Sequence, residues 1–140
     1  MRRGLVMIGA LIGGGLLAAF ASPVAPATSF DIWGTGPDIL TYNRLMGTCE
    51  TVTHAFGRNA AWGRWEMPLA QVDVTIAPAA TDEGAKMTFT CRDGADCIRA
   101  GALDRTPNRV AIHAVRFGSM ERALELEGAI SRLRGACAAA

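Results

Sequence analysis

The alternation of hydrophobic and polar residues through the middle of the chain predicts β-strands. Between residues 48 and 117, apolar side chains recur at every second position in several short runs, most regularly from Val72 to Ile76. Turn residues, among them Gly57 and Gly94, separate these runs. Because strands that bury one face show this period of two, we expect five or six strands in a curved antiparallel sheet or partial barrel.

The last part of the chain changes to a helical pattern. Apolar residues recur there with spacings of three and four, which places them on one side of a helix, and Ser119 precedes them as a capping residue. These residues are Ala123, Leu126, Ile130, Leu133 and Cys137. We expect this C-terminal helix to cover the sheet.

A second, short helix is predicted near the start of the folded part. Pro37 suits the first helical position, Asp38 the first turn, and Gly47 the position just past the end. The buried stripe of this helix would consist of Ile39, Tyr42, Leu45 and Met46. The predicted fold class is therefore α+β: a curved antiparallel sheet or partial barrel of five or six strands, covered by a C-terminal helix, with a short N-terminal helix.

The first 21 residues have the layout of a secretory signal peptide. Arg2 and Arg3 precede an uncharged apolar stretch that ends in small residues around Ala21. We expect cleavage after Ala21, and the alternatives are cleavage after Ala27 and an uncleaved N-terminal anchor. No stable membrane span is expected once the signal is removed.

The rest of the chain divides into a flexible leader, residues 22–36, and a single domain, residues 37–140. A domain of this length can bury a hydrophobic core, but it is too short for the two lobes of a kinase or a cofactor-binding dehydrogenase. The 140 residues include 14 basic and 13 acidic ones. This balance gives no support for a nucleic-acid partner or for an anionic membrane surface.

The arginines of the second half of the chain lie among acidic residues. They occupy positions 92, 99, 105, 109 and 116, and the acids are Asp93, Asp96 and Asp104. We expect a mixed, solvated face from this arrangement.

The four cysteines indicate an oxidising compartment. Thirteen of the 14 basic residues are arginine, a bias typical of GC-rich bacterial genomes. Together with the predicted signal peptide, this bias predicts a periplasmic or extracellular protein, where cysteines are oxidised. Cys91 and Cys97 lie three residues on either side of Gly94, which would make them facing, disulfide-bonded positions of a hairpin. By elimination Cys49, between the predicted short helix and the first strand, joins Cys137. The other two pairings of the four cysteines are alternatives.

No catalytic residue, metal site or cofactor is expected. Bridged cysteines leave no thiolate to act as a nucleophile or to bind zinc. His54 and His113, the two histidines, lie in strand-like segments, where the expected role is a structural one on a half-buried sheet.

The candidate binding surface consists of Trp62, Trp65, Arg64 and Arg58. The two tryptophans are three positions apart in a predicted strand, so their side chains should point to opposite faces and only one should belong to the core. Large aromatic side chains and arginine are favoured in the centre of interfaces.

The sequence thus predicts a small, exported, non-catalytic binding or interaction domain stabilised by two disulfides. Its ligand is left open among protein, peptide, glycan and lipid, and a hydrolase inhibitor is one concrete form of such a domain. The alternative function is a small periplasmic hydrolase that uses carboxylates such as Asp73 or Glu66.

Overall fold

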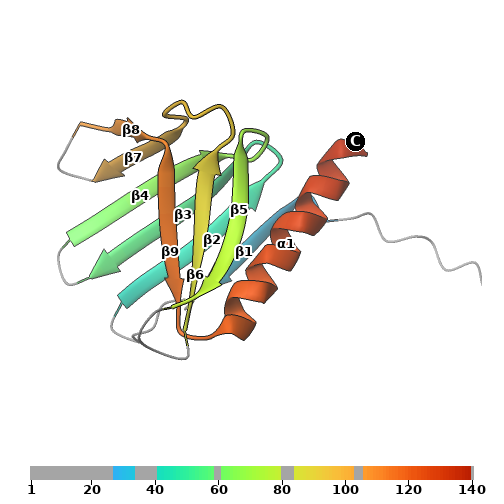
Figure 1. The fold of residues 1–140 in the computed structure, drawn as a ribbon, viewed down its shortest axis with the longest axis horizontal. Coiled ribbons are helices and arrows are strands. Elements are labelled where there is room, and N and C mark those ends of the chain that lie inside the picture. Colours follow the sequence, from blue (N-terminus) through green and yellow to red (C-terminus); the bar gives the residue numbers. More distant parts are fainter. Residues whose placement is uncertain (1–26, 34–40, 59–60, 80–83, 103–105, 140) are drawn as a thin grey trace, which may run out of the picture.

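A computed structural model describes residues 27–33, 41–58, 61–79, 84–102 and 106–139 of the protein. The described chain forms strands in two antiparallel sheets and one C-terminal helix (Figure 1). The strands are β1 (Ser29–Trp33), β2 (Thr41–Thr48), β3 (Thr51–Arg58), β4 (Ala61–Pro68), β5 (Val72–Pro78), β6 (Ala85–Cys91), β7 (Ile98–Ala102), β8 (Asn108–Val110) and β9 (Ile112–Phe117), and the helix is α1 (Met120–Ala138). The predicted β-rich α+β class is confirmed, with more strands than the five or six expected.

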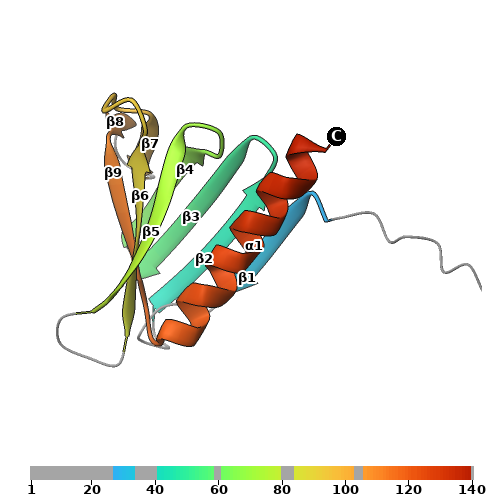
Figure 2. The same ribbon diagram turned by 45° about the vertical axis from the view of Figure 1, so that its right-hand side comes forward.

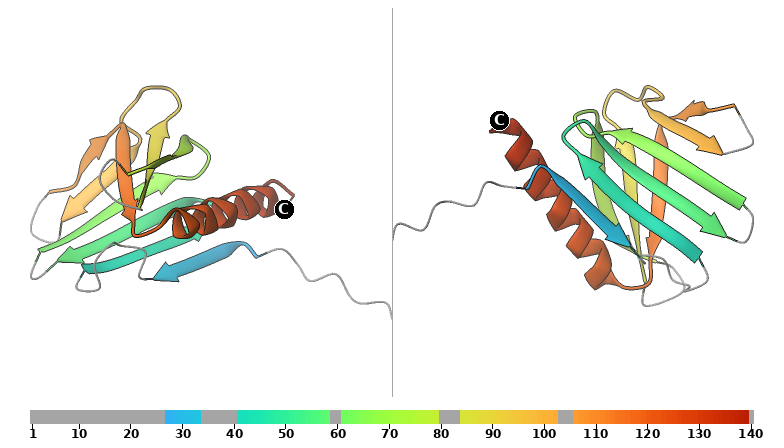
Figure 3. Two further views of the ribbon diagram at one scale, coloured as in Figure 1. Left: turned by 60° about the horizontal axis from the view of Figure 1, so that its bottom comes forward. Right: turned by 180° about the vertical axis from the view of Figure 1, so that it is seen from behind.

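The two sheets differ in size and face each other. The larger has the strand order β1-β2-β3-β4-β7-β8, and the smaller has the order β5-β6-β9. Figure 2 shows the smaller sheet and α1 on the same side of the larger sheet, with α1 running along β1 and β2. The larger sheet therefore has an inner face, covered by the smaller sheet and the helix, and an outer face, which is turned to the viewer in the right-hand view of Figure 3.

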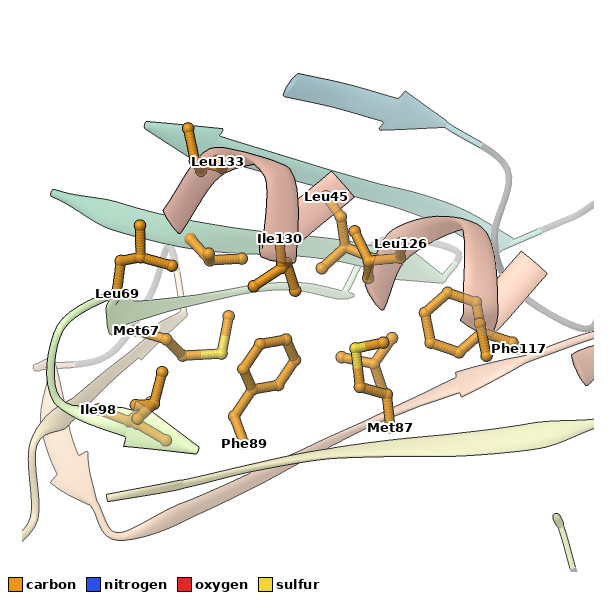
Figure 4. Close-up of a cluster of buried hydrophobic side chains, with 14 of the residues drawn as sticks. Leu45, Met67, Leu69, Met87, Phe89, Ile98, Phe117, Leu126, Ile130 and Leu133 are labelled. Atoms are coloured by element: carbon orange, nitrogen blue, oxygen red, sulfur yellow. The ribbon is translucent and has the colours of Figure 1, made fainter. Parts of the chain in front are cut away.

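The hydrophobic core fills the space between the sheets and the helix. Leu126, Ile130 and Leu133 of α1 point toward Leu45 of β2 and Phe89 of β6 (Figure 4). All five side chains are almost completely removed from water. Each buried side chain of this size contributes about 1.5–3 kcal/mol through the hydrophobic effect, so this contact holds the helix to both sheets.

The C-terminal helix is confirmed in its position and its cap. Ser119 has an extended backbone, and its Oγ accepts a hydrogen bond from the Arg122 backbone N–H at 3.2 Å, as an N-cap residue does. Its predicted apolar side faces the core, with Ala123 fully buried at the first turn. In the described residues, no helix is long and apolar enough to cross a membrane.

The predicted short N-terminal helix is wrong over residues 41–47, which belong to strand β2; residues 37–40 lie outside the described residues. Asn43, Leu45 and Gly47 alternate as buried positions of β2, and the strand pairs with β1 on one side and β3 on the other. A Cβ atom at Gly47 would overlap the ring of Phe30 on β1. Gly47 therefore makes room for a cross-strand aromatic ring and does not end a helix.

The predicted leader also contains structure. Residues 29–33 form the edge strand β1 and pair with β2. Phe30 and Ile32 pack against the core, which is the physical reason that this polar-looking segment is ordered. The predicted signal peptide and the first part of the leader, residues 1–26, lie outside the described residues.

Both predicted disulfides are present, with changed surroundings. Cys91 and Cys97 are bonded with a Cα–Cα distance of 5.9 Å, and Gly94 between them has the positive φ of 66° that favours glycine. The expectation that they face each other on a hairpin is wrong, because β6 and β7 belong to different sheets. This bridge instead closes the turn that carries the chain from one sheet to the other.

The second disulfide joins Cys49 to Cys137 across 88 residues of chain. Cys49 lies in the turn between β2 and β3, and Cys137 lies in the last turn of α1. The bridge therefore clamps the helix to the larger sheet and not, as predicted, one helix to another. Two disulfides in a small domain are consistent with export to an oxidising compartment.

Arg134 ties the end of α1 to the turn between β4 and β5. Its guanidinium donates hydrogen bonds to the backbone oxygens of Leu69 and Val72 at 3.3 and 2.5 Å. We expect Arg134→Met to lower the free energy of unfolding by about 2 kcal/mol, because both carbonyls lose their charged donor. Urea denaturation measures this loss. Arg132→Met, an exposed position of the same helix, is the matched control, and an equal loss in both variants would contradict the assigned role.

Candidate functional site

The alternation along β4 sends its two tryptophans to opposite faces of the larger sheet, as predicted. Trp62 shares the outer face with Arg64 and Glu66, and 42 % of its surface is exposed. Trp65 is on the inner face, where it is half-buried against the core. Ile112 and Leu124 are also exposed, and Trp62 is the aromatic member of this set, which makes it the candidate for a stacking contact.

A groove of about 630 Å³ surrounds Trp62 on this outer face. We call it the outer groove. It is built from β4 and β7, and its lining includes Ala55, Trp62, Arg64, Glu66, Arg99 and Pro107. Glycines and alanines make up the rest of its lining, and their small side chains leave the groove shallow. Trp62 is the one aromatic residue among the lining residues.

Close contact between Trp62 and a glycine holds its ring in place. Trp62 is opposite Gly57 in the β3–β4 ladder, and a Cβ atom at Gly57 would come within 2.7 Å of the ring. The ring therefore lies against the backbone of β3. A ring held in this way loses little conformational entropy when a ligand packs on it.

Charged side chains lie beside this ring. Glu66 forms ion pairs with Arg64 at 3.2 Å and with Arg99 at 3.7 Å, and all three are partly or largely exposed. One carboxylate thus forms ion pairs with two guanidinium groups. Both guanidinium groups are held near the groove, and one positive charge there is left in excess. Exposed pairs of this kind contribute little to stability, about 0–1 kcal/mol each.

The fourth residue of the predicted surface, Arg58, is the last residue of β3, next to Ala61 in the ladder. Its side chain is outside the part of the chain that the structure describes. Of the predicted surface, Trp62 and Arg64 therefore come together on the outer face, and Trp65 faces the other way.

A second groove, of about 430 Å³, opens on the inner side of the same strands. Its lining includes Phe56, Trp62, Trp65, Ala100 and Asn108. Trp62 and Gly101 line both grooves, so the two lie on either side of the β4–β7 pair. No acidic residue of the described chain lines this inner groove.

Beyond the inner groove, a polar cluster interrupts the hydrophobic interior. It consists of Asn43, His54, Trp65 and His113, and we call it the histidine cluster. His54 Nδ1 and His113 Nε2 are 2.8 Å apart, and His54 Nε2 is 2.7 Å from Asn43 Oδ1. The ring of His113 stacks on Trp65 with centroids 4.4 Å apart. The cluster joins β2, β3 and β4 of the larger sheet to β9 of the smaller one.

The hydrogen bonds define the protons of this cluster. With Asn43 Oδ1 as an acceptor, His54 carries its proton on Nε2, so its Nδ1 accepts the N–H of His113. Burial, together with a smaller contribution from charge repulsion by His113, lowers the pKa of His54 to about 3. Burial lowers the pKa of His113 to about 4. Both histidines are therefore neutral at pH 7 and link the two sheets.

Sequence reasoning assigned these histidines a structural role but did not bring them together. His54 is two positions from Val52 and from Phe56, and His113 is two positions from Val115, so each histidine shares the inward face of its strand with apolar residues. The inward direction of both histidines could therefore be predicted from the strand period. Their contact could not, because 59 residues separate them and they belong to different sheets.

The carboxylates of the alternative hydrolase do not converge. Asp73 is on β5 in the smaller sheet and forms an ion pair with Arg92 at 2.8 Å, whereas Glu66 is on β4 and pairs with arginines. General acid–base hydrolysis of a glycosidic bond needs two carboxyl groups roughly 5–10 Å apart across one site. In the described ranges there is also no group of three or more His, Cys, Asp or Glu side chains placed to hold a metal ion.

Comparison of the chain with protein-family models, with curated proteins and with solved structures finds no match.

Proposed function

We propose that this protein is an exported, non-catalytic domain that binds a carbohydrate chain in the outer groove, with Trp62 as the stacking platform. The observation that carries the proposal is the exposed, glycine-backed ring of Trp62 inside a groove with polar arginine and glutamate side chains. A sugar ring offers an apolar face of C–H groups to the aromatic ring and hydroxyl groups to the charged side chains.

The position of the groove favours a glycan over the other ligand classes. A peptide bound as an added strand needs a free sheet edge, but β4 pairs with β3 and β7, and β7 pairs with β4 and β8. A lipid chain needs a deep apolar cavity, whereas the outer groove is open and has Arg64, Glu66 and Arg99 in its lining. A glycan chain needs neither a sheet edge nor an interior cavity.

We expect Trp62→Ala to weaken glycan binding at least about tenfold, as truncation of a central interface tryptophan does. The probes are hexasaccharides of β-1,4- and α-1,4-linked hexoses and of the corresponding uronic acids. Binding is measured by isothermal titration calorimetry and by the NMR shift of the Trp62 indole N–H.

The matched control is Ile112→Ala, which removes an exposed hydrophobic side chain on β9, away from the groove. This control should bind as the wild type does, and both variants should stay folded, as judged by melting temperature. Absence of binding of every hexasaccharide to the wild type would overturn the proposed function, as would equal binding by Trp62→Ala.

A further inference from the structure

The outer face beyond Trp62 carries a pair of arginines that the fold brings together against their mutual repulsion. Arg99 on β7 is directly opposite Arg109 on β8 in the ladder, and both side chains are exposed. Like charges in directly opposed positions destabilise a sheet. The pair therefore has no stabilising role in the folded domain itself.

The nearby acids do not neutralise this pair. Glu66, opposite Arg99 on β4, is shared between Arg99 and Arg64, and Arg109 forms no ion pair within the part of the chain that the structure describes. Three arginines thus face one glutamate on the outer side of β4, β7 and β8. Glu66, which is opposite Arg99, gives this face the mixed charge that was expected, with arginines in excess.

The arginines continue the outer groove away from Trp62. Arg64 and Glu66 follow Trp62 along β4, Arg99 lies on the next strand, and Arg109 lies on the strand after that. With strand spacings of about 4.8 Å and a rise of about 3.3 Å per residue, Trp62 and Arg109 are roughly 16 Å apart. This length suits an oligosaccharide and not a single sugar.

From this arrangement we infer that the glycan is acidic: its sugar rings pack on Trp62, and its carboxylates bind Arg64, Arg99 and Arg109. This inference rests on the proposed function and adds the chemical class of the ligand. A guanidinium binds a carboxylate through two parallel hydrogen bonds, and the repulsion between two opposed, exposed arginines is relieved when a carboxylate lies between them. Glu66 holds two of the arginines in position until the ligand arrives.

The test compares each uronic acid hexamer with the neutral hexamer of the same linkage, using the full mature protein. We expect the acidic hexamer to bind about tenfold more tightly than the neutral one at 50 mM salt, and this advantage to shrink at 200 mM salt. Arg109→Gln should lower affinity for the acidic hexamer about fivefold and leave affinity for the neutral hexamer unchanged.

Arg116→Gln is the matched control, because it removes an exposed arginine from β9 of the smaller sheet. If acidic and neutral hexamers bind equally well and Trp62→Ala abolishes the binding of both, the inference that the glycan is acidic is overturned. The proposed glycan-binding function would still stand. Tighter binding of a single-stranded oligothymidylate than of any uronic acid hexamer would also overturn the acidic-glycan inference, in favour of a nucleic acid. If Arg116→Gln lowers the affinity for the acidic hexamer as much as Arg109→Gln does, the effect depends on general charge. The assignment of the binding site to Arg64, Arg99 and Arg109 is then overturned.

Discussion

Replacing Cys49 and Cys137 together by alanine is expected to lower the free energy of unfolding by about 4–5 kcal/mol. The bridge closes 88 residues of chain, and on the loop-entropy model the unfolded protein gains conformational freedom in proportion to the logarithm of that length. A loss of this size is a large part of the 5–15 kcal/mol that usually separates folded from unfolded domains. Urea denaturation of wild type and variant measures it.

The other disulfide provides the control for this prediction. Cys91 and Cys97 are only six residues apart, so their replacement by alanine should cost about 2 kcal/mol on the same model. The dependence of unfolding free energy on urea should also become steeper when the long bridge is removed, because the unfolded chain then exposes more surface. Equal losses for the two bridges would contradict the loop-length explanation.

Acidification from pH 7.5 to 5 is expected to destabilise the domain by about 4 kcal/mol through the histidine cluster, roughly 2 kcal/mol for each histidine. The folded-state pKa values are about 3 for His54 and about 4 for His113, whereas the unfolded values are near 6.5. Below pH 6.5 the unfolded chain therefore binds more protons than the folded one, so stability falls as pH falls toward 4. Above pH 6.5 the contribution is fully present.

Among the described residues no acidic side chain raises the pKa of either histidine, which makes this cluster sensitive to acid. Its neighbours are Asn43 and Trp65, and the other inward-facing side chains of β3, β6, β7 and β9 are apolar. Protonation of both imidazoles would place two positive charges and two N–H donors against each other, which removes the hydrogen bond between the two sheets. We expect the first opening on acidification to occur at this end of the domain.

The variant His113→Gln separates the cluster from other acid effects. The glutamine amide can still donate a hydrogen bond to His54 Nδ1, but it does not titrate. Unfolding free energies are measured at several pH values between 7.5 and 5. The decrease that the histidine cluster causes over this range should be about half as large in the variant as in the wild type. An unchanged pH dependence in this variant would mean that folding does not shift the pKa of His113, which would contradict the assigned effect of burial.

The binding proposal and the histidine cluster concern opposite faces of the larger sheet. Trp62 and the arginines lie on the outer face, and His54, Trp65 and His113 lie on the inner face. Variants of the outer groove should therefore leave the pH dependence of stability unchanged. This separation allows ligand binding and acid stability to be tested in the same set of variants.

Much of the local structure followed from the sequence because it depends on short-range periodicity. The spacing of Leu126, Ile130 and Leu133 predicted a helix with one apolar side, and Ser119 predicted its start. The strand period predicted that Trp62 and Trp65 face opposite ways. Where a turn signal competed with the strand period, as at Gly47, the helix prediction failed, because pairing with β1 and β3 outweighs local propensity.

The sequence by itself determined the β-rich α+β class, the capped C-terminal helix, the favoured pairing of the four cysteines and the opposite directions of Trp62 and Trp65. Only the tertiary structure decided that Arg64, Arg99 and Arg109 share one face, that His54 meets His113, and that residues 41–48 form a strand. The physical reason is that local periodicity sets the direction of a side chain, whereas strand pairing and the stacking of two sheets determine which distant side chains it meets.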